Sequence, residues 1–243
     1  MTAGKNLVLP KSESWKMFNR ISAKYDLLNR LLSFGLDIRW RKALIQCIPT
    51  GKRIFLLDLA TGTGDVILTL MKNCSQVVQA KGIDLAENML KVGREKIAKS
   101  PQAQAIQLLA GDANQVPFDN NTFDLTTIAF GIRNVEDPVK VMREMHRVLK
   151  PDGRSLILEF SLPANPALRF FHLIYLKIIV PFLGGLISGD WKAYRYLNQT
   201  IEQFPYGQAF CDLLNQSGFK NVRQIPLLWG VASIYQADKG GNA

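Results

Sequence analysis

The sequence has few of the residues on which metal and disulfide proteins depend. Its 243 residues include three cysteines and two histidines. The cysteines lie far apart, and no C-x-x-C pair or Cys/His cluster occurs. We therefore expect neither a disulfide framework nor a metal, and a reducing compartment. Residues 1–13 also lack the apolar segment of a secretory signal, which favours a cytoplasmic location.

An uninterrupted apolar segment of membrane-spanning length is also missing. Residues 166–189 are strongly apolar, but their longest uncharged run, Ile178–Gly189, has only 12 residues, among them one proline and three glycines. A transmembrane helix needs roughly 20 apolar residues. We therefore predict that this segment does not span a membrane. It should form a helical lid over an apolar pocket or an element that lies in a lipid interface.

Acidic residues are outnumbered by basic ones, 20 against 30, which gives a net charge of +10. This excess suits nucleic acid or an anionic membrane face, although a basic soluble surface is an alternative. An RNA-binding enzyme should carry a basic appendage. The additional segment here is apolar instead, and no block of five basic residues occurs. We therefore expect no nucleic acid partner, and peripheral contact with the anionic inner face of the membrane.

The sequence does contain a strand, a glycine turn and a helix in succession, which begin many nucleotide-binding α/β folds. An apolar run of strand length, Ile54–Leu59, precedes Gly62 and Gly64, and a helical pattern follows. Glycine lets the backbone approach a ligand closely and adopt positive φ angles. We predict that Gly62 and Gly64 contact a cofactor, with a tight turn that binds nothing as the alternative.

The charges around this turn argue against a dinucleotide. The G-x-G-x-x-G pattern would need glycine at position 67, where this chain has Ile67. Asp58 at the strand end and Asp65 at the helix start would both repel a pyrophosphate. Two carboxylates suit a ligand with positive groups. S-adenosylmethionine carries an ammonium and a sulfonium and no phosphate, so we predict this cofactor, with Asp58 in its site.

Strands and helices alternate from Ile54 to Phe160, which predicts a parallel, doubly wound sheet. Only three residues separate Ile225 from Trp229, so the last two strands should form an antiparallel hairpin. Together these patterns predict a Rossmann-like class I methyltransferase fold, with a seven-stranded, mostly parallel sheet, N-terminal helices and a helical lid. The predicted strands are Ile54–Leu59, Gln76–Asp84, Ala105–Ala110, Leu125–Phe130, Arg154–Phe160, Val222–Ile225 and Leu228–Tyr235.

We predict one domain, residues 14–243, after a flexible tail at residues 1–13. Its parts are N-terminal helices at 14–50, a cofactor-binding core at 51–160, an apolar helical lid at 161–204, and a C-terminal helix and hairpin at 205–243.

Acidic residues also end the next two predicted strands. Asp84 follows Gly64 by 20 residues, the offset at which a carboxylate can accept hydrogen bonds from both ribose hydroxyls. Asp112 follows the third strand, where an acid can bond the adenine amino group and the backbone N–H of Ala113 a ring nitrogen. We predict these cofactor contacts. A helix cap at Asp84 and a turn residue at Asp112 are the alternatives.

Several segments resemble the ubiquinone/menaquinone biosynthesis C-methyltransferases. The run YDLLNRLLSFG at 25–35, continued to Trp40, is similar to the N-terminal signature of that family. GIRNV at 131–135, followed by RVLKPDGR at 147–154 and LEF at 158–160, resembles its second signature, and AYRYL at 193–197 also fits. The similarity covers roughly Ser14 to Tyr235.

The resemblance implies cofactor contacts at Thr63, Asp84, Asp112, Ala113 and position 129. Several family members have serine at this last position, so Ala129 can contribute only a backbone or apolar contact. Two further positions depart from the family. Asp37 stands where the signature has histidine, and Tyr235 lies near the place of an Ala-Leu-His-Arg segment.

The reaction implied by the resemblance is methylation of a ring carbon of a polyprenylated quinol. Arg133 and Asn134 follow the fourth predicted strand, at the edge where ligands bind. We predict that Arg133 stabilises the phenolate, that Asn134 orients it, and that Tyr25 bonds the hydroxyl. The lid would contribute Asp190 or Tyr194. A salt bridge that packs the loop is the alternative role of Arg133.

The substrate implied is demethylmenaquinol, which would become menaquinol. A polyprenyl benzoquinol of ubiquinone biosynthesis and another lipophilic molecule are the alternatives. A homodimer is a further open expectation.

Overall fold

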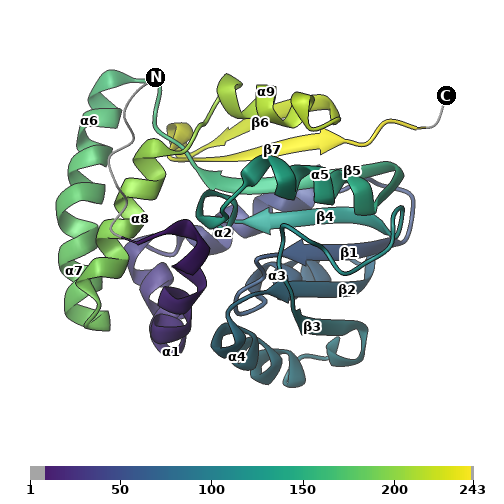
Figure 1. The fold of residues 1–243 in the computed structure, drawn as a ribbon, viewed down its shortest axis with the longest axis horizontal. Helices are drawn as coiled ribbons and strands as arrows, with labels where there is room; N and C mark the ends of the chain where they lie inside the picture. The colour runs from purple at the N-terminus through teal and green to yellow at the C-terminus, as the bar shows by residue number, and fades with distance from the viewer. Residues whose placement is uncertain (1–8, 242–243) are drawn as a thin grey trace.

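The computed structural model describes residues 9–241, and its seven strands form one sheet in the order β3-β2-β1-β4-β5-β7-β6 (Figure 1). Strands β1 to β5 pair in parallel, and β7 is antiparallel to both β5 and β6. This topology confirms the predicted fold class. The strands are β1 Ile54–Leu59, β2 Val77–Asp84, β3 Ile106–Ala110, β4 Phe123–Ala129, β5 Leu149–Phe160, β6 Lys220–Leu227 and β7 Ala232–Asp238.

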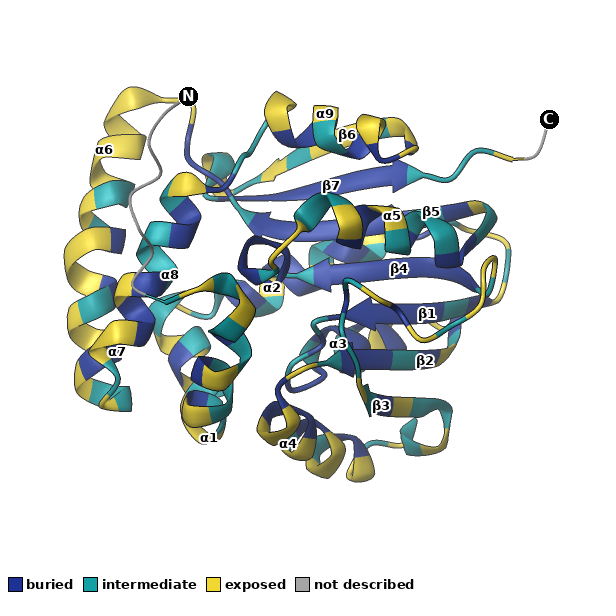
Figure 2. Cartoon of the chain, viewed as in Figure 1, coloured by how far each residue is buried: buried dark blue, intermediate teal, exposed yellow. Residues whose placement is uncertain are grey.

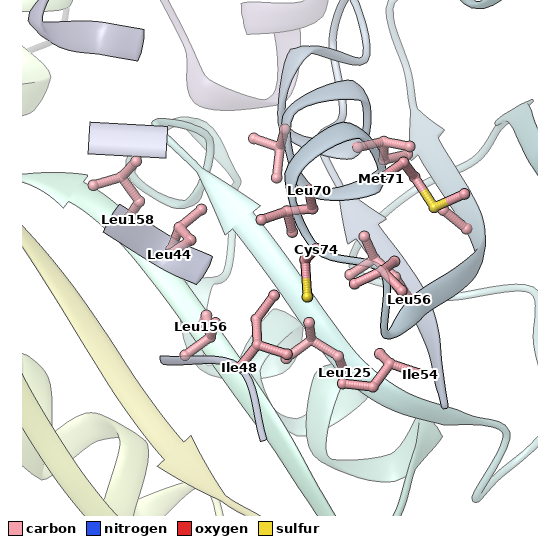
Figure 3. Close-up of a cluster of buried hydrophobic side chains, with 14 of the residues drawn as sticks. Leu44, Ile48, Ile54, Leu56, Leu70, Met71, Cys74, Leu125, Leu156 and Leu158 are labelled. Atoms are coloured by element: carbon pink, nitrogen blue, oxygen red, sulfur yellow. The ribbon is translucent and has the colours of Figure 1, made fainter. Parts of the chain in front are cut away.

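Helices cover both faces of the sheet because its central strands are apolar on both sides. In β1, Ile54 and Leu56 belong to one buried cluster and Leu57 and Leu59 to another, as the alternation of side chains along a strand requires. Helices α2, α3 and α4 contribute to the first cluster, part of which Figure 3 shows, and α5 and α9 to the second. The helices are α1 Ser14–Leu32, α2 Leu36–Ala43, α3 Asp65–Asn73, α4 Glu87–Ala98, α5 Pro138–Val148, α6 Pro166–Ile174, α7 Val180–Ser188, α8 Trp191–Gln203 and α9 Gln208–Gln216.

The predicted tail at 1–13 lies largely outside the described residues. Its last residues, Lys11–Glu13, form a 3-10 turn that leads directly into α1.

Helices α1, α6, α7 and α8 gather beyond the carboxyl ends of the parallel strands (Figure 1). A third buried cluster, which includes Met17, Leu28, Leu176 and Tyr196, joins them. Helices α7 and α8 pack closely because Gly184 has no side chain: a Cβ there would collide with the ring of Tyr194. These helices therefore form a cover over the edge of the sheet where ligands bind in such folds.

The apolar segment forms one continuous helix despite its proline, glycines and charged residues. A π-helical segment, Tyr175–Ile179, joins α6 to α7 and accommodates Pro181 in the first turn of α7. The resulting helix, Pro166–Ser188, has 23 residues, and an 18-residue stretch of it has a mean hydropathy of 1.9, so by length and composition alone it could cross a membrane. The proline, glycines and charged residues thus do not break the helix, and the prediction that it does not span a membrane stays a prediction. Its inner face, with Leu176 and Val180, packs into the third cluster.

Candidate active site

Two adjoining cavities lie at the carboxyl edge of the sheet. The first cavity, of about 150 Å³, and the second cavity, of about 260 Å³, share four lining residues: Phe18, Tyr25, Phe130 and Asn134. Ligands bound in the two cavities would therefore meet beside these residues.

The first cavity carries more negative than positive charge. Among the described residues, its charged lining groups are Asp84, Asp112, Glu136 and Lys11. Three acids against one base suit a cationic ligand and oppose a phosphate. The structure therefore supports the charge argument made from the sequence, although with different acids. The predicted cofactor residues that line this cavity are Gly62, Asp84, Asp112, Ala113 and Ala129.

Asp84 is fixed where β2 ends. One carboxylate oxygen accepts a hydrogen bond from the Gly62 N–H and the other from the Ala86 N–H, each at 2.8 Å. Burial raises the pKa of Asp84, although these backbone donors oppose the shift. The carboxylate ties the glycine turn to β2, and its remaining lone pairs can accept bonds from a ligand in the cavity.

Asp112 bonds within its own turn. Its Oδ1 accepts the backbone N–H of Asn114 at 2.8 Å and the side-chain amide of Asn114 at 2.9 Å. The other carboxylate oxygen accepts no hydrogen bond from the described residues. Asp112 therefore serves the turn and also lines the first cavity, and its contact with adenine stays a prediction.

Three of the predicted cofactor residues do not line the first cavity. Asp58 is 1% exposed, and its carboxylate accepts hydrogen bonds from Thr61 Oγ1 at 2.7 Å and Thr127 Oγ1 at 2.5 Å. It therefore supports the glycine turn from beneath and faces no ligand. Thr63 is buried, and Gly64, with φ of +75°, precedes α3. These residues shape the turn.

An ionic network that the sequence did not predict lies beside the turn. Thr63 Oγ1 donates to Asp26 Oδ1 at 2.7 Å, and Lys96 Nζ contacts Asp26 Oδ2 at 2.8 Å. Lys96 also pairs with Asp65, which lies 3.1 Å from an Arg41 nitrogen. The charge of Asp65 is thus neutralised and cannot repel a phosphate as predicted. Asp26 adjoins Tyr25 in the first signature and could have been noticed, whereas Lys96 carried no signal.

Asp58 should make folding stability depend on pH. Burial raises its pKa to about 7 from a usual 3.8, against the opposing hydrogen bonds from Thr127 and Thr61. Between these values the folded state binds more protons than the unfolded state, so stability falls as pH rises, by about 4 kcal/mol over the full interval. Asp58→Asn removes this dependence. In denaturant titrations, its stability relative to the wild type should increase from pH 4 to pH 8. An equal difference at both pH values would contradict this assignment.

The second cavity is mainly aromatic and aliphatic. Its walls come from α1, α2, α6, α7 and α8, together with the ends of β4 and β5. Trp40, Phe130 and Phe160 form a group of rings at the sheet end, with centroid separations from 4.6 to 6.0 Å. Such a lining suits an apolar ligand.

Arg133 brings a cation to the second cavity. Its Nη1 lies 2.5 Å from Glu159 Oε1 and 2.7 Å from the Phe130 carbonyl, and its guanidinium stacks 5.1 Å from the centre of the Phe160 ring. Nε is buried and has no hydrogen-bond partner among the described residues. Leaving such a donor unpaired costs about 1–3 kcal/mol. Arg133 therefore has the predicted salt bridge, while its Nε–H stays unpaired. Glu159 had not been singled out from the sequence.

Asn134 and Tyr25 lie at the junction of the two cavities. Asn134 Nδ2 donates to the Phe130 carbonyl at 3.2 Å, and burial raises the pKa of Tyr25. Of the two lid candidates, Tyr194 lines the second cavity, and burial raises its pKa to about 12. Asp190 does not line it. Its carboxylate caps α8 and pairs with Arg20 at 2.9 Å.

The sheet order and the helices on both of its faces are those of the class I methyltransferase fold, and the acidic first cavity suits the cationic cofactor S-adenosylmethionine. Solved structures share this architecture at low sequence identity. A possible histamine N-methyltransferase from Thermotoga maritima matches with a TM-score of 0.63 and 18% identity over 93% of this chain and 99% of its own. The [4+2]-cyclase SpnF matches with a TM-score of 0.64 and 14% identity over 99% and 100%. These similarities establish the fold.

The chain belongs to the ubiE/COQ5 methyltransferase family, whose model matches residues 8–239. The ubiquinone/menaquinone biosynthesis C-methyltransferase UbiE of Geobacter sulfurreducens is 42% identical over 224 residues, 92% of this chain and 87% of that protein. The demethylmenaquinone methyltransferase of Thermus thermophilus is 42% identical over 223 residues, 92% of this chain and 100% of that protein.

Proposed function

We propose that this enzyme methylates a ring carbon of a polyprenylated quinol, converting demethylmenaquinol to menaquinol. One observation carries the proposal: an apolar cavity with a buried arginine adjoins the acidic cofactor cavity at Tyr25 and Asn134. The relatives named above for quinone methylation support the same chemistry. The first cavity would hold S-adenosylmethionine against Asp84, Asp112 and Gly62, and that cofactor supplies a methyl group that is already electrophilic.

The protein residues would make the quinol ring carbon nucleophilic. Loss of the ring hydroxyl proton spreads negative charge onto the adjacent carbon. The buried guanidinium of Arg133, which lines the second cavity, would stabilise that phenolate, since a fixed donor in a dry site acts strongly on developing charge. Asn134 would orient the oxygen. Burial keeps the Tyr25 hydroxyl protonated, so it would donate a hydrogen bond and not remove the proton. Arginine is also too basic to accept it, which leaves a water held by these groups.

The same proposal includes the cellular setting. A prenylated substrate resides in the bilayer, so the enzyme would work in the cytoplasm, peripherally at the inner membrane face, and without a metal. The positive net charge of +10 suits that anionic face.

Mass analysis of the quinol tests the reaction. The enzyme is incubated with S-adenosylmethionine carrying a labelled methyl group and with either demethylmenaquinol or a 2-methoxy-6-polyprenyl-benzoquinol, with and without EDTA. We expect the label in the naphthoquinol ring at equal rates under both conditions. Label only in the benzoquinol would change the assigned ring. No label in either quinol, from protein that still binds the cofactor, would overturn the proposed reaction.

A further inference from the structure

The outward side of the long helix is apolar and uncovered. Phe170, Phe171, Ile178, Phe182 and Leu186 are each more than half exposed, and Figure 2 shows the outer side of α6 and α7 largely as exposed residues. Three of them, Ile178, Phe182 and Leu186, follow one another at intervals of four residues and share one side of the helix. Soluble monomers seldom expose a contiguous apolar surface of this kind without a partner.

Two exposed aromatic residues beside this helix hold unfavourable backbone angles. Phe34 is 79% exposed with φ of +52°, and Trp229 is 75% exposed with φ of +54°. Bulky side chains seldom adopt positive φ, and such angles tend to mark functional positions. Both residues therefore hold an aromatic ring at the surface, although their positive φ angles are unfavourable for a bulky side chain.

These aromatic residues stand where the second cavity reaches the surface. Phe34 lines the cavity, as does Leu228, the neighbour of Trp229. The ring of Phe34 lies 6.0 Å from that of Tyr175, within the long helix. On the other side, a Cβ on Gly230 would lie 3.4 Å from Cα of Pro163, just before α6. The cavity therefore reaches the surface beside the long helix, whose Tyr175, Leu176 and Val180 form part of its wall.

The charges of this region are complementary to an anionic surface. The only charged residues of Pro166–Ser188, apart from its histidine, are Arg169 and Lys177; both are basic, and Lys177 pairs with Glu202 on α8 at 3.1 Å. Two more exposed basic residues, Lys192 and Arg195, follow on α8. A second copy of the chain on this surface would bring like charges together, because a two-fold contact pairs a patch with itself. Anionic lipid headgroups would attract them.

We propose that a docking face, made of the outward side of Pro166–Ser188 with Phe34 and Trp229, lies in the headgroup–acyl boundary of an anionic bilayer. The second cavity opens within this face, so a prenyl tail passes from the bilayer into the cavity without crossing water. Interfacial helices of this type insert an apolar side and keep basic residues among the headgroups, with aromatic residues at the boundary. The docking face rests on the proposed function in one respect only, which is the identity of the substrate.

Vesicle flotation combined with two substrates tests the docking face. We expect the wild type to float with phosphatidylcholine vesicles that contain phosphatidylglycerol, less so in high salt, and weakly with phosphatidylcholine alone. The double variant Phe171→Ser/Ile178→Ser should lower the bound fraction at least tenfold. It should lower turnover of a long-tailed quinol in those vesicles similarly, yet keep turnover of a short-tailed, soluble quinol within twofold. Both side chains are exposed and line neither cavity.

A matched pair of charge variants separates local attraction from net charge. Arg169→Glu on the docking face should weaken flotation several-fold, whereas Lys72→Glu on α3, with the same change in net charge, should not. Equal effects would overturn the docking face. Unchanged flotation of the double variant would also overturn it, as would a dimer in light scattering that the double variant dissociates without any vesicle binding. If the wild type methylates neither quinol, the proposed reaction fails, while flotation still decides the docking face.

Discussion

Arg133→Lys is expected to lower the turnover of quinol methylation about 100- to 1,000-fold while leaving S-adenosylmethionine affinity nearly unchanged. Removing one preorganised donor to a developing oxyanion has an effect of this size. Lysine can still pair with Glu159, but it lacks the further N–H donors of the planar Arg133 guanidinium. Arg133 lines the second cavity and not the first, so cofactor binding should persist. Single-turnover kinetics and calorimetry measure the two quantities separately.

The choice of variant and control matters because Arg133 is buried. Arg133→Ala would leave Glu159 unpaired in the interior, and breaking such a pair costs about 3–5 kcal/mol of stability. Arg147→Lys is the matched control. Arg147 also pairs with a glutamate, Glu144 at 2.7 Å, but lines neither cavity. Its variant should turn over within twofold of the wild type. Wild-type turnover of Arg133→Lys would remove Arg133 from the mechanism and leave only its structural salt bridge.

Asp84→Asn is expected to weaken S-adenosylmethionine binding about 10- to 150-fold, which corresponds to the 1.5–3 kcal/mol of hydrogen bonds to a charged group. The asparagine has one acceptor oxygen, whereas both oxygens of Asp84 accept backbone N–H groups. The glycine turn would loosen, and the ribose would lose an anionic acceptor. Isothermal titration calorimetry gives the affinity, and quinol turnover at saturating cofactor should change much less.

Affinity should also depend on pH in the wild type. Because burial raises the pKa of Asp84, its carboxylate protonates at a higher pH than an ordinary aspartate. Cofactor affinity should therefore be complete above that raised pKa and decline as pH falls through it, with a flatter profile for Asp84→Asn. Asp137→Asn is the matched control, since Asp137 caps α5 and asparagine caps equally well. Wild-type affinity in Asp84→Asn would exclude the ribose contact.

The sheet could be predicted because its signals are local. The apolar run at Ile54–Leu59, the acids that end β2 and β3, and the short connection between β6 and β7 each depend on residues close in sequence. Asp137 and Pro138 begin α5 as neighbours, and the Lys140 N–H donates to the Asp137 carboxylate at 3.0 Å. Parallel pairing then follows from the alternation of strands and helices.

The acids around the glycine turn could not be assigned in the same way. Asp58 and Asp65 adjoin the glycines in sequence, yet one is buried under Thr61 and Thr127 and the other pairs with Lys96 and Arg41. Side chains that leave one turn in different directions meet different partners. Those partners lie up to 69 residues away along the chain.

By itself, the sequence determined the fold class, the family and the acidic character of the cofactor site, because periodicity and short motifs encode them. Only the tertiary structure decided that Asp84 and not Asp58 faces the first cavity, that Arg133 pairs with Glu159 and leaves Nε unpaired, and that Pro166–Ser188 is one continuous helix with an uncovered apolar side. These features depend on contacts between residues far apart in the chain, and on which side of a helix finds neighbours, neither of which is encoded in any single segment.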